Sequence, residues 1–250
     1  MRPPVTLPEG YRALAFPTLD STNAEALRRA ASGEAGGLWI QADVQTAGRG
    51  RQGRDWQSSS GNLFASLLLR PACDLATAQQ LAFVAALAAC DAASSLRGSD
   101  RGLKLKWPND LLLDGAKVAG ILLESAGSAE MGHAVVIGTG LNLAHAPQDT
   151  ARPATQLAMA GELIEVREAF HALARSTGHW LAVWLDGLGW SRVRTEWMAR
   201  GPDIGQRLRI NCGGEAAEGA YAGLDSDGAL LLDTGGPAPQ RFLVGDVFVL

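Results

Sequence analysis

The sequence predicts an α+β protein in which a large domain of strands and helices is followed by a small all-β domain. Before Pro202, short apolar runs typical of strands alternate with segments of helical period. After Pro202 only short strand patterns remain, and glycine-rich turns divide them. The chain has 250 residues, which is enough for one large core and a smaller unit, so we predict domains at residues 1–202 and 203–250.

Composition excludes several classes of function. The net charge is -4 with 19% charged residues, so the chain as a whole is not an electrostatic partner for nucleic acid. Residues 1–12 lack the apolar core of a signal peptide, and the longest apolar run, 81–90, is too short for a membrane span. We therefore expect a cytoplasmic protein with no membrane partner. Its three cysteines and four histidines lack metal-ligand spacing, so no metal site is predicted.

The predicted large domain begins with a short lead-in at residues 1–17. A helix is expected over 20–33, because Thr22 and Glu25 have the spacing of a capping box. Thr77 and Gln80 have the same spacing at the start of a second helix ending near Leu96, whose nearly unbroken apolar surface places it in the core. Two further helices are expected at 162–185 and 190–198.

The expected strands of the large domain surround these helices. The run at 63–69 is almost entirely apolar, so this strand is expected to be buried on both faces. The other strands are expected at 36–44, 103–107, 111–113, 117–124 and 134–137.

The small domain is predicted to be a β-barrel of the SH3 kind. Its strands are expected at 207–210, 217–224, 230–233, 241–244 and 247–250. Fewer than about 50 residues form a thin core, so we expect this domain to pack against the large one.

A loop at residues 47–56 carries the most specific chemical signal. Flexible glycine backbone there carries several guanidinium groups that can close on an anion, although an exposed basic turn has the same composition. The alternating residues are Gly48, Arg49, Gly50, Arg51, Gly53 and Arg54. The spelling also matches a dinucleotide fingerprint, but no helical pattern follows it, and no Gly-Lys-Ser/Thr completes a Walker loop.

Polar residues before the loop indicate a small neutral ligand group. Ser21, Thr22 and Asn23 lie at a helix start, where they serve either as a plain cap or as partners for a urea, amide or carboxylate. Gln45 ends the preceding strand, and its amide both donates and accepts hydrogen bonds. Gly120 interrupts a strand, which indicates close approach of a ligand or of another backbone.

Four motifs in register, following Ser21-Thr22-Asn23, resemble those of the biotin protein ligases. They are GRGRQGRDW at 48–56, KWPND at 106–110, KVAGIL at 117–122 and GTGLN at 138–142. The resemblance implies a mixed sheet flanked by helices, similar to class II aminoacyl-tRNA synthetases and lipoate ligases, followed by an SH3-like barrel. It also implies the ligase-only form without an N-terminal DNA-binding domain, and related ligases often form homodimers through a sheet edge.

The activity implied by this resemblance has two steps. Biotin and ATP, with Mg²⁺, give biotinyl-5′-AMP and pyrophosphate. The biotinyl group then passes to one lysine of a biotin carboxyl carrier protein, from acetyl-CoA carboxylase or a related biotin-dependent enzyme.

The resemblance also implies roles for individual residues. The biotin-binding positions are Ser21, Thr22, Asn23, Gln45, Arg49, Gly50, Arg51 and Lys117. The positions for ATP or the adenylate are Arg51, Arg54, Trp56, Asn109, Asp110, Lys117 and Asn142. Lys117, Arg51 and Arg49 are the catalytic cations, whereas Gln52 replaces a residue that is basic in some relatives.

Two other functions compete with this interpretation. A lipoate ligase has the same chemistry, but its long acyl pocket is apolar, and the polar set of Ser21, Thr22, Asn23 and Gln45 argues against it. A nucleic-acid-binding module would use the arginine loop on phosphates, but the acidic net charge and the lack of interleaved surface aromatics argue against that module.

Overall fold

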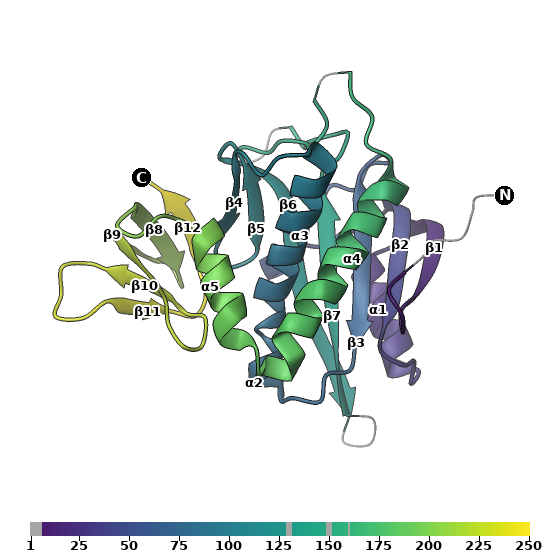
Figure 1. The fold of residues 1–250 in the computed structure, drawn as a ribbon, viewed down its shortest axis with the longest axis horizontal. Coiled ribbons are helices and arrows are strands. Elements are labelled where there is room, and N and C mark those ends of the chain that lie inside the picture. The colour runs from purple at the N-terminus through teal and green to yellow at the C-terminus, as the bar shows by residue number, and fades with distance from the viewer. Residues whose placement is uncertain (1–6, 129–131, 149–151, 160) are drawn as a thin grey trace.

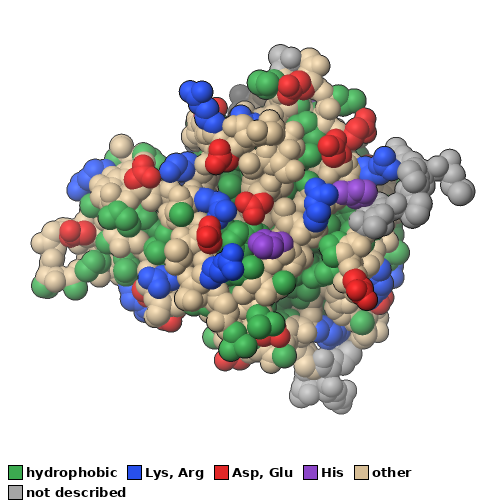
Figure 2. Space-filling model, viewed as in Figure 1, with side chains coloured by type: hydrophobic (Ala, Val, Ile, Leu, Met, Phe, Trp, Pro, Cys, Tyr) green, Lys and Arg blue, Asp and Glu red, His purple; other side chains and the backbone are tan. Residues whose placement is uncertain are grey.

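The computed structural model describes residues 7–128, 132–148, 152–159 and 161–250. Two sheets and the helices that pack on them form one body, with the smaller sheet at the C-terminal end (Figure 1). On the face seen in Figure 2, Lys and Arg side chains are interspersed with Asp and Glu side chains.

The large sheet has seven strands in the order β1-β2-β3-β7-β6-β5-β4. β1 pairs with β2 in parallel and the other neighbours are antiparallel, so the sheet is mixed, as predicted. The strands are β1 (Arg12–Leu19), β2 (Leu38–Gln45), β3 (Leu63–Leu69), β4 (Leu103–Lys106), β5 (Asp110–Leu113), β6 (Ala116–Ser128) and β7 (Gly132–Leu141).

Helices cover both faces of this sheet. The helices are α1 (Thr22–Ala31), α2 (Leu75–Ala78), α3 (Leu81–Arg97), α4 (Val166–Trp184) and α5 (Trp190–Arg200), with short 3₁₀ turns at Arg51–Gly53 and Leu185–Gly187. α3 and α4 lie on one face and α1 on the other (Figure 1). Alternation along β3 explains this division, because Leu67 faces the α3 side whereas Leu68 packs with α1.

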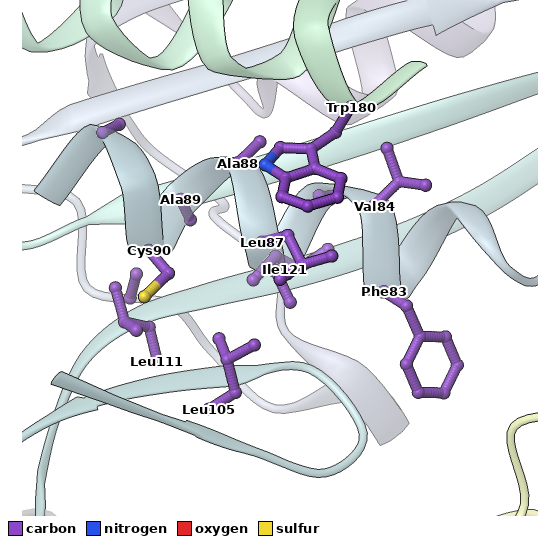
Figure 3. Packing of buried hydrophobic residues seen from close by; sticks show 14 of the residues in the cluster. Phe83, Val84, Leu87, Ala88, Ala89, Cys90, Leu105, Leu111, Ile121 and Trp180 are labelled. Atoms are coloured by element: carbon purple, nitrogen blue, oxygen red, sulfur yellow. The ribbon is translucent and has the colours of Figure 1, made fainter. Parts of the chain in front are cut away.

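The core helix α3 is apolar on nearly every side, as predicted. Leu75–Arg97 is long and apolar enough to span a membrane by length and composition alone. Within the described structure, however, α3 packs against α4, α5 and the sheet, and most of its side chains are buried. Figure 3 shows Val84 and Leu87 of α3 near Trp180, whereas the Phe83 ring points away from it. This is the environment of a core helix in a globular domain.

The C-terminal sheet is antiparallel and has five strands. They are β8 (Arg207–Cys212), β9 (Glu215–Leu224), β10 (Leu230–Asp233), β11 (Gln240–Phe242) and β12 (Asp246–Val249), in the order β11-β10-β9-β8-β12. β11 and β12 are the two edges and do not pair with each other among the described residues, so the predicted barrel is not closed. Only three residues connect β11 to β12. Such a connection spans at most about 14 Å, whereas the two edges of a flat five-stranded sheet are about 19 Å apart. The sheet must therefore curl.

The two sheets share one hydrophobic core. Phe83 of α3 lies edge-on to Trp190 and Trp197 of α5. Trp107 Nε1 donates to the carbonyl of Gly228 in the C-terminal sheet at 3.1 Å. The expected packing of the small domain against the large one is therefore present.

Several sequence-based boundaries were wrong. The lead-in contains β1, an edge strand that tolerates Pro17 because one side of an edge strand needs no hydrogen bond. The cap of α1 is Ser21, which accepts from Ala24 N, rather than Thr22. Asp74 caps α2.

Other differences concern element lengths. The second predicted helix splits into α2 and α3, and Gln80 Oε1 accepts from Trp184 Nε1 instead of forming a capping box. α4 begins at Val166 rather than at residue 162. β7 runs through Gly138 and Gly140 to Leu141, where the sequence indicated a strand ending at residue 137.

Candidate active site

A cavity of about 360 Å³ opens where α1, β2, the arginine loop and β5 to β7 meet. All thirteen predicted site residues line it: Ser21, Thr22, Asn23, Gln45, Arg49, Gly50, Arg51, Arg54, Trp56, Asn109, Asp110, Lys117 and Asn142. Five basic and three acidic side chains line the cavity, so it has excess positive charge although the chain carries -4. Such a cavity favours an anionic ligand.

One end of the cavity is polar and largely buried. Ser21 caps α1, which brings Thr22 to the end of β2. Thr22 N and Thr22 Oγ1 both donate to Gln45 Oε1, at 2.8 and 3.1 Å. Gln45 Nε2 donates to Ser58 Oγ at 2.9 Å. These contacts fix the Gln45 amide at the cavity wall.

Asn23 is held from the opposite side of the same wall. Its Nδ2 donates to Glu124 Oε2 at 2.7 Å, and Ser66 Oγ donates to its Oδ1 at 2.6 Å. Glu124 also accepts from Arg49 Nη2 at 3.2 Å, which links this wall to the arginine loop.

The arginine loop turns tightly at its tip. Gln52 and Gly53 have φ of 58° and 70°, a left-handed conformation that favours glycine and costs a residue such as glutamine. At the loop base, a Cβ on Gly48 would lie 2.5 Å from both Ser58 Oγ and the Trp56 carbonyl oxygen, so only glycine fits there.

Each arginine of the loop has a polar partner in this state. Arg49 pairs with Glu124, Arg51 Nη1 donates to Asn109 Oδ1 at 3.1 Å, and Arg54 Nη2 lies 2.6 Å from Asp246 Oδ2. Burial lowers the pKa of Arg51 from its usual value, and a guanidinium remains charged at neutral pH after such a shift. An anionic ligand would compete with these partners.

Lys117, near the start of β6, lines the same cavity. Its Nζ is 2.6 Å from Asp110 Oδ1, and Lys106 Nζ is 3.9 Å from the other oxygen of the same carboxylate. Burial is the main cause that lowers the pKa of Lys106 to about 8. The Lys117 backbone is also held, because its N–H donates to Pro153 O and its carbonyl accepts from Thr155 N, both at 2.9 Å.

Trp56 also lines the cavity, with its ring against Gly120 and Gly140. A Cβ on Gly140 would lie 2.5 Å from the indole, so this glycine makes room for the ring. Lys117 Nζ is 5.2 Å from the centroid of the Trp56 ring. Gly120 also lies next to the ring, and the groups that approach it closely are the side chains of Trp56 and Lys117 rather than the predicted ligand or backbone. Asn142 is buried, and its Nδ2 donates to Thr155 O at 3.0 Å.

Sequence reasoning missed five residues that build or support this site. Glu124, Ser58 and Ser66 hold the predicted residues, whereas Arg152 and Asp246 line the cavity themselves. A lone carboxylate ending the apolar strand at 117–124 was a signal for Glu124. Asp246 had none, because it reaches the cavity only through the packing of the C-terminal sheet.

The side chains that could ligate a metal ion indicate how such an ion would bind. Among the described residues, no group of three or more His, Cys, Asp or Glu side chains is arranged to hold a metal ion. Mg²⁺ commonly keeps several waters and binds through substrate phosphates. A magnesium ion entering with the nucleotide fits this cavity better than an ion bound to the protein alone.

Comparison with known proteins shows the family. Residues 15–142 match the biotin/lipoate A/B protein ligase family, and residues 203–250 match the biotin protein ligase C-terminal domain. A biotin--[acetyl-CoA-carboxylase] ligase of Paracoccus denitrificans is 42% identical over 230 residues, covering 90% of this chain and 94% of that protein. The chain belongs to the biotin protein ligase family.

Other relatives agree with this membership. A biotin--[acetyl-CoA-carboxylase] ligase of Mycobacterium tuberculosis is 35% identical over 224 residues, covering 86% of this chain and 81% of that protein. The bifunctional ligase/repressor BirA of Bacillus subtilis is 31% identical, covering 90% of this chain and 70% of BirA.

The solved structures show the same fold. The biotin protein ligase from Aquifex aeolicus in complex with biotin and ATP superimposes with a TM-score of 0.79 at 24% identity, covering 95% of this chain and 99% of that one. The fold that the resemblance implied is confirmed, with an open five-stranded C-terminal sheet in place of a closed barrel.

Proposed function

We propose that this ligase activates biotin with ATP as biotinyl-5′-AMP and transfers the biotinyl group to one lysine of a biotin carboxyl carrier protein. The observation that supports it most directly is the arrangement of one cavity. A fixed polar wall at Thr22 and Gln45, an arginine loop and a paired lysine, Lys117, surround the same space. A polar head, a carboxylate and a phosphate can therefore bind together.

In the first step, a biotin carboxylate oxygen attacks the α-phosphorus of ATP, and the bond to pyrophosphate breaks. Both reactants are anionic, so their approach requires fixed positive charge in a site of low water content. Arg49 and Arg51 supply charge from the loop, and Lys117 supplies it from the opposite wall. Mg²⁺ bound to the nucleotide would screen the leaving pyrophosphate.

In the second step, the ε-amine of the carrier lysine attacks the acyl carbon, AMP leaves and an amide forms. The mixed anhydride hydrolyses readily in water, so the cavity must stay closed until the carrier arrives. A glycine-rich loop such as residues 47–56 can open for substrates and close over the intermediate.

The proposed binding roles follow the position of each residue on the wall. Ser21, Thr22, Asn23 and Gln45 surround the polar head of biotin, with Gly50 giving backbone access at the loop. Arg54, Trp56, Asn109, Asp110 and Asn142 lie on the nucleotide side. The polar wall favours a ureido head over the apolar ring of lipoate.

A pyrophosphate-release assay tests the proposed activity. The chain is mixed with Mg²⁺ and ATP together with biotin, lipoate or no acid. We expect pyrophosphate release in the mixture with biotin and not in the other two. When a carrier domain is then added to the biotin mixture, its mass should increase by one biotinyl group. Release with lipoate but not with biotin would refute the substrate assignment, and no release with either acid would refute the activity.

We also propose a homodimer, for which the large sheet offers a route. β1 is one of the two edge strands of that sheet, and exposed strand edges can pair with another chain. Sedimentation velocity with and without biotin and ATP measures the oligomeric state. A monomer at all concentrations would contradict this proposal.

Cytoplasmic location stays a prediction.

A further inference from the structure

Ser66 is a polar side chain buried in a strand that is otherwise apolar. It lies at the centre of β3 with 0% of its surface exposed. Its hydroxyl is 2.6 Å from Asn23 Oδ1 and 2.7 Å from Thr22 Oγ1, so its one proton is shared between these two acceptors. A buried hydroxyl is costly unless it is hydrogen-bonded, so this position has a specific polar role.

The strand opposite provides room for this arrangement. Ser66 pairs with Gly138 across β3 and β7. A Cβ on Gly138 would collide with the side-chain amide of Asn23. Ser66 and Gly138 together therefore form the seat of the Asn23 amide.

The neighbours of both amides determine which way each one faces. Glu124 is ion-paired with Arg49 and accepts only, so the nitrogen of Asn23 must face it and the oxygen must face Ser66. The backbone N–H of Thr22 donates only, so the oxygen of Gln45 must face Thr22. The wall therefore has one fixed pattern of donors and acceptors.

Groups with remaining hydrogen-bonding capacity define what the wall can bind. Gln45 Nε2 keeps one proton beyond its bond to Ser58, and the Ser21 hydroxyl, which accepts from Ala24 N, keeps its proton. Asn23 Oδ1 keeps one lone pair. Gln45 and Ser21 can therefore donate to one carbonyl oxygen, and Asn23 can accept from one N–H. A cyclic urea carries both of these groups.

We propose that Ser66 is a specificity-determining positioning residue, which does not line the cavity but fixes the Asn23 amide and the Thr22 hydroxyl so that the wall selects a ureido head. The inference rests on the proposed function. Without the Ser66 hydroxyl, the Asn23 oxygen loses its donor, and only the bonds of Asn23 Nδ2 to Glu124 and to the Leu122 carbonyl still hold the amide. The wall then loses the fixed acceptor that it offers to a urea N–H.

Ligand binding to Ser66→Ala tests this role by calorimetry with biotin and with its oxazolidinone analogue, in which a ring oxygen replaces the urea N–H that would face Asn23. We expect the Kd of biotin to rise about tenfold, the effect of losing one well-placed hydrogen bond. The Kd of the oxazolidinone analogue should change less than twofold, because it has no N–H for the Asn23 oxygen to accept, and the KM of ATP should not change. Gly138→Ala should give the same selective loss, because it displaces the same amide.

Leu68→Val is the matched control, because Leu68 is buried on the same face of β3 but belongs to the α1 core. It should lower stability without changing the ratio of the two Kd values. Equal weakening of both ligands by Ser66→Ala, or no change in either, would overturn the role of Ser66 and leave the proposed function intact. A wild-type chain that binds neither ligand would overturn both.

Discussion

Lys117 is the residue on which the proposed chemistry depends most. Its Nζ lies 2.6 Å from Asp110 and 5.2 Å from the Trp56 ring centroid, so its position is fixed before any ligand binds. A cation that needs no rearrangement stabilises developing charge more than a mobile one does. The arginines, by contrast, must leave Glu124 and Asn109 to reach a ligand.

Replacing Lys117 by Ala should reduce adenylate formation by at least about a hundredfold, because a fixed cation at the reacting centre is lost. Biotin-dependent exchange of pyrophosphate into ATP measures this step alone. The fold should be retained, since the Lys117 side chain is 29% exposed. Lys104→Ala is the control, because Lys104 pairs with Asp203 away from the cavity. Wild-type exchange in Lys117→Ala would refute the role.

Lys106 should make stability depend on pH. Burial lowers its pKa to about 8 in the folded chain, against about 10.4 when unfolded. Between these values the unfolded state binds more protons, so the free energy of unfolding rises with pH from about 8 to about 10. Denaturant unfolding of wild type and Lys106→Met, compared across this range, should show that rise in wild type alone. Parallel curves would contradict the shifted pKa.

The residues that could be predicted from sequence were those within short motifs. All thirteen predicted positions line one cavity. They lie within short sequence motifs, and these motifs fall on the strand ends and the loop that border the cavity. Ser66, Glu124 and Asp246 could not be found this way. Their partners lie 43, 101 and 192 residues away along the chain, and such contacts are formed only by tertiary packing.

At the scale of elements, the arginine loop combines tight anchoring at its base with a strained tip. Trp56 N donates to Gly48 O at 3.0 Å and Gly50 N to Arg54 O at 2.7 Å, whereas Gln52 has φ of 58°. A loop held by its own backbone and by exposed ion pairs opens at low cost in free energy.

Hydrogen exchange should therefore report loop closure. Amides of residues 48–54 should exchange at least about tenfold more slowly with biotin and ATP than without them, because the closed loop is protected from opening. The turn at Gly213 and Gly214, which lies outside the cavity, serves as the internal control. Equal exchange in the free and saturated states would show that the loop does not close.

Element type was easier to predict than element ends. The β3 strand matched its apolar run at 63–69 because burial on both faces leaves a continuous pattern. β1 was missed because an edge strand buries little and contains Pro17. The cap of α1 was misplaced by one residue because Ser21 and Thr22 are both suitable caps, and only contact with Gln45 distinguishes them.

At the scale of the whole molecule, the two sheets share one hydrophobic core. Phe83 packs against the helix that carries Trp190 and Trp197, and Trp190 Nε1 donates to Ser226 O in the C-terminal sheet. Asp246 then joins that sheet to the cavity through Arg54 and Arg152. The C-terminal sheet thus contributes to both stability and the site.

Unfolding in urea should accordingly be a single transition, coincident by tryptophan fluorescence and far-UV circular dichroism. Gly228→Ala should lower the midpoint of that whole transition, because its Cβ would lie 2.9 Å from the Phe83 ring. Gly235→Ala is the matched control, with φ of 86° against 87° and no atom within 4 Å of its Cβ. Separate transitions for the two sheets would contradict a shared core.

The central claim is that the arginine loop closes over a biotin–AMP junction held from the other side by Lys117. A crystal structure with a non-hydrolysable analogue of biotinyl-5′-AMP tests it most directly. We predict that Arg49 and Arg51 have left Glu124 and Asn109 and contact the junction, with Lys117 opposite them and the ureido ring against Gln45. A ligand bound elsewhere, or arginines still on their present partners, would contradict the account.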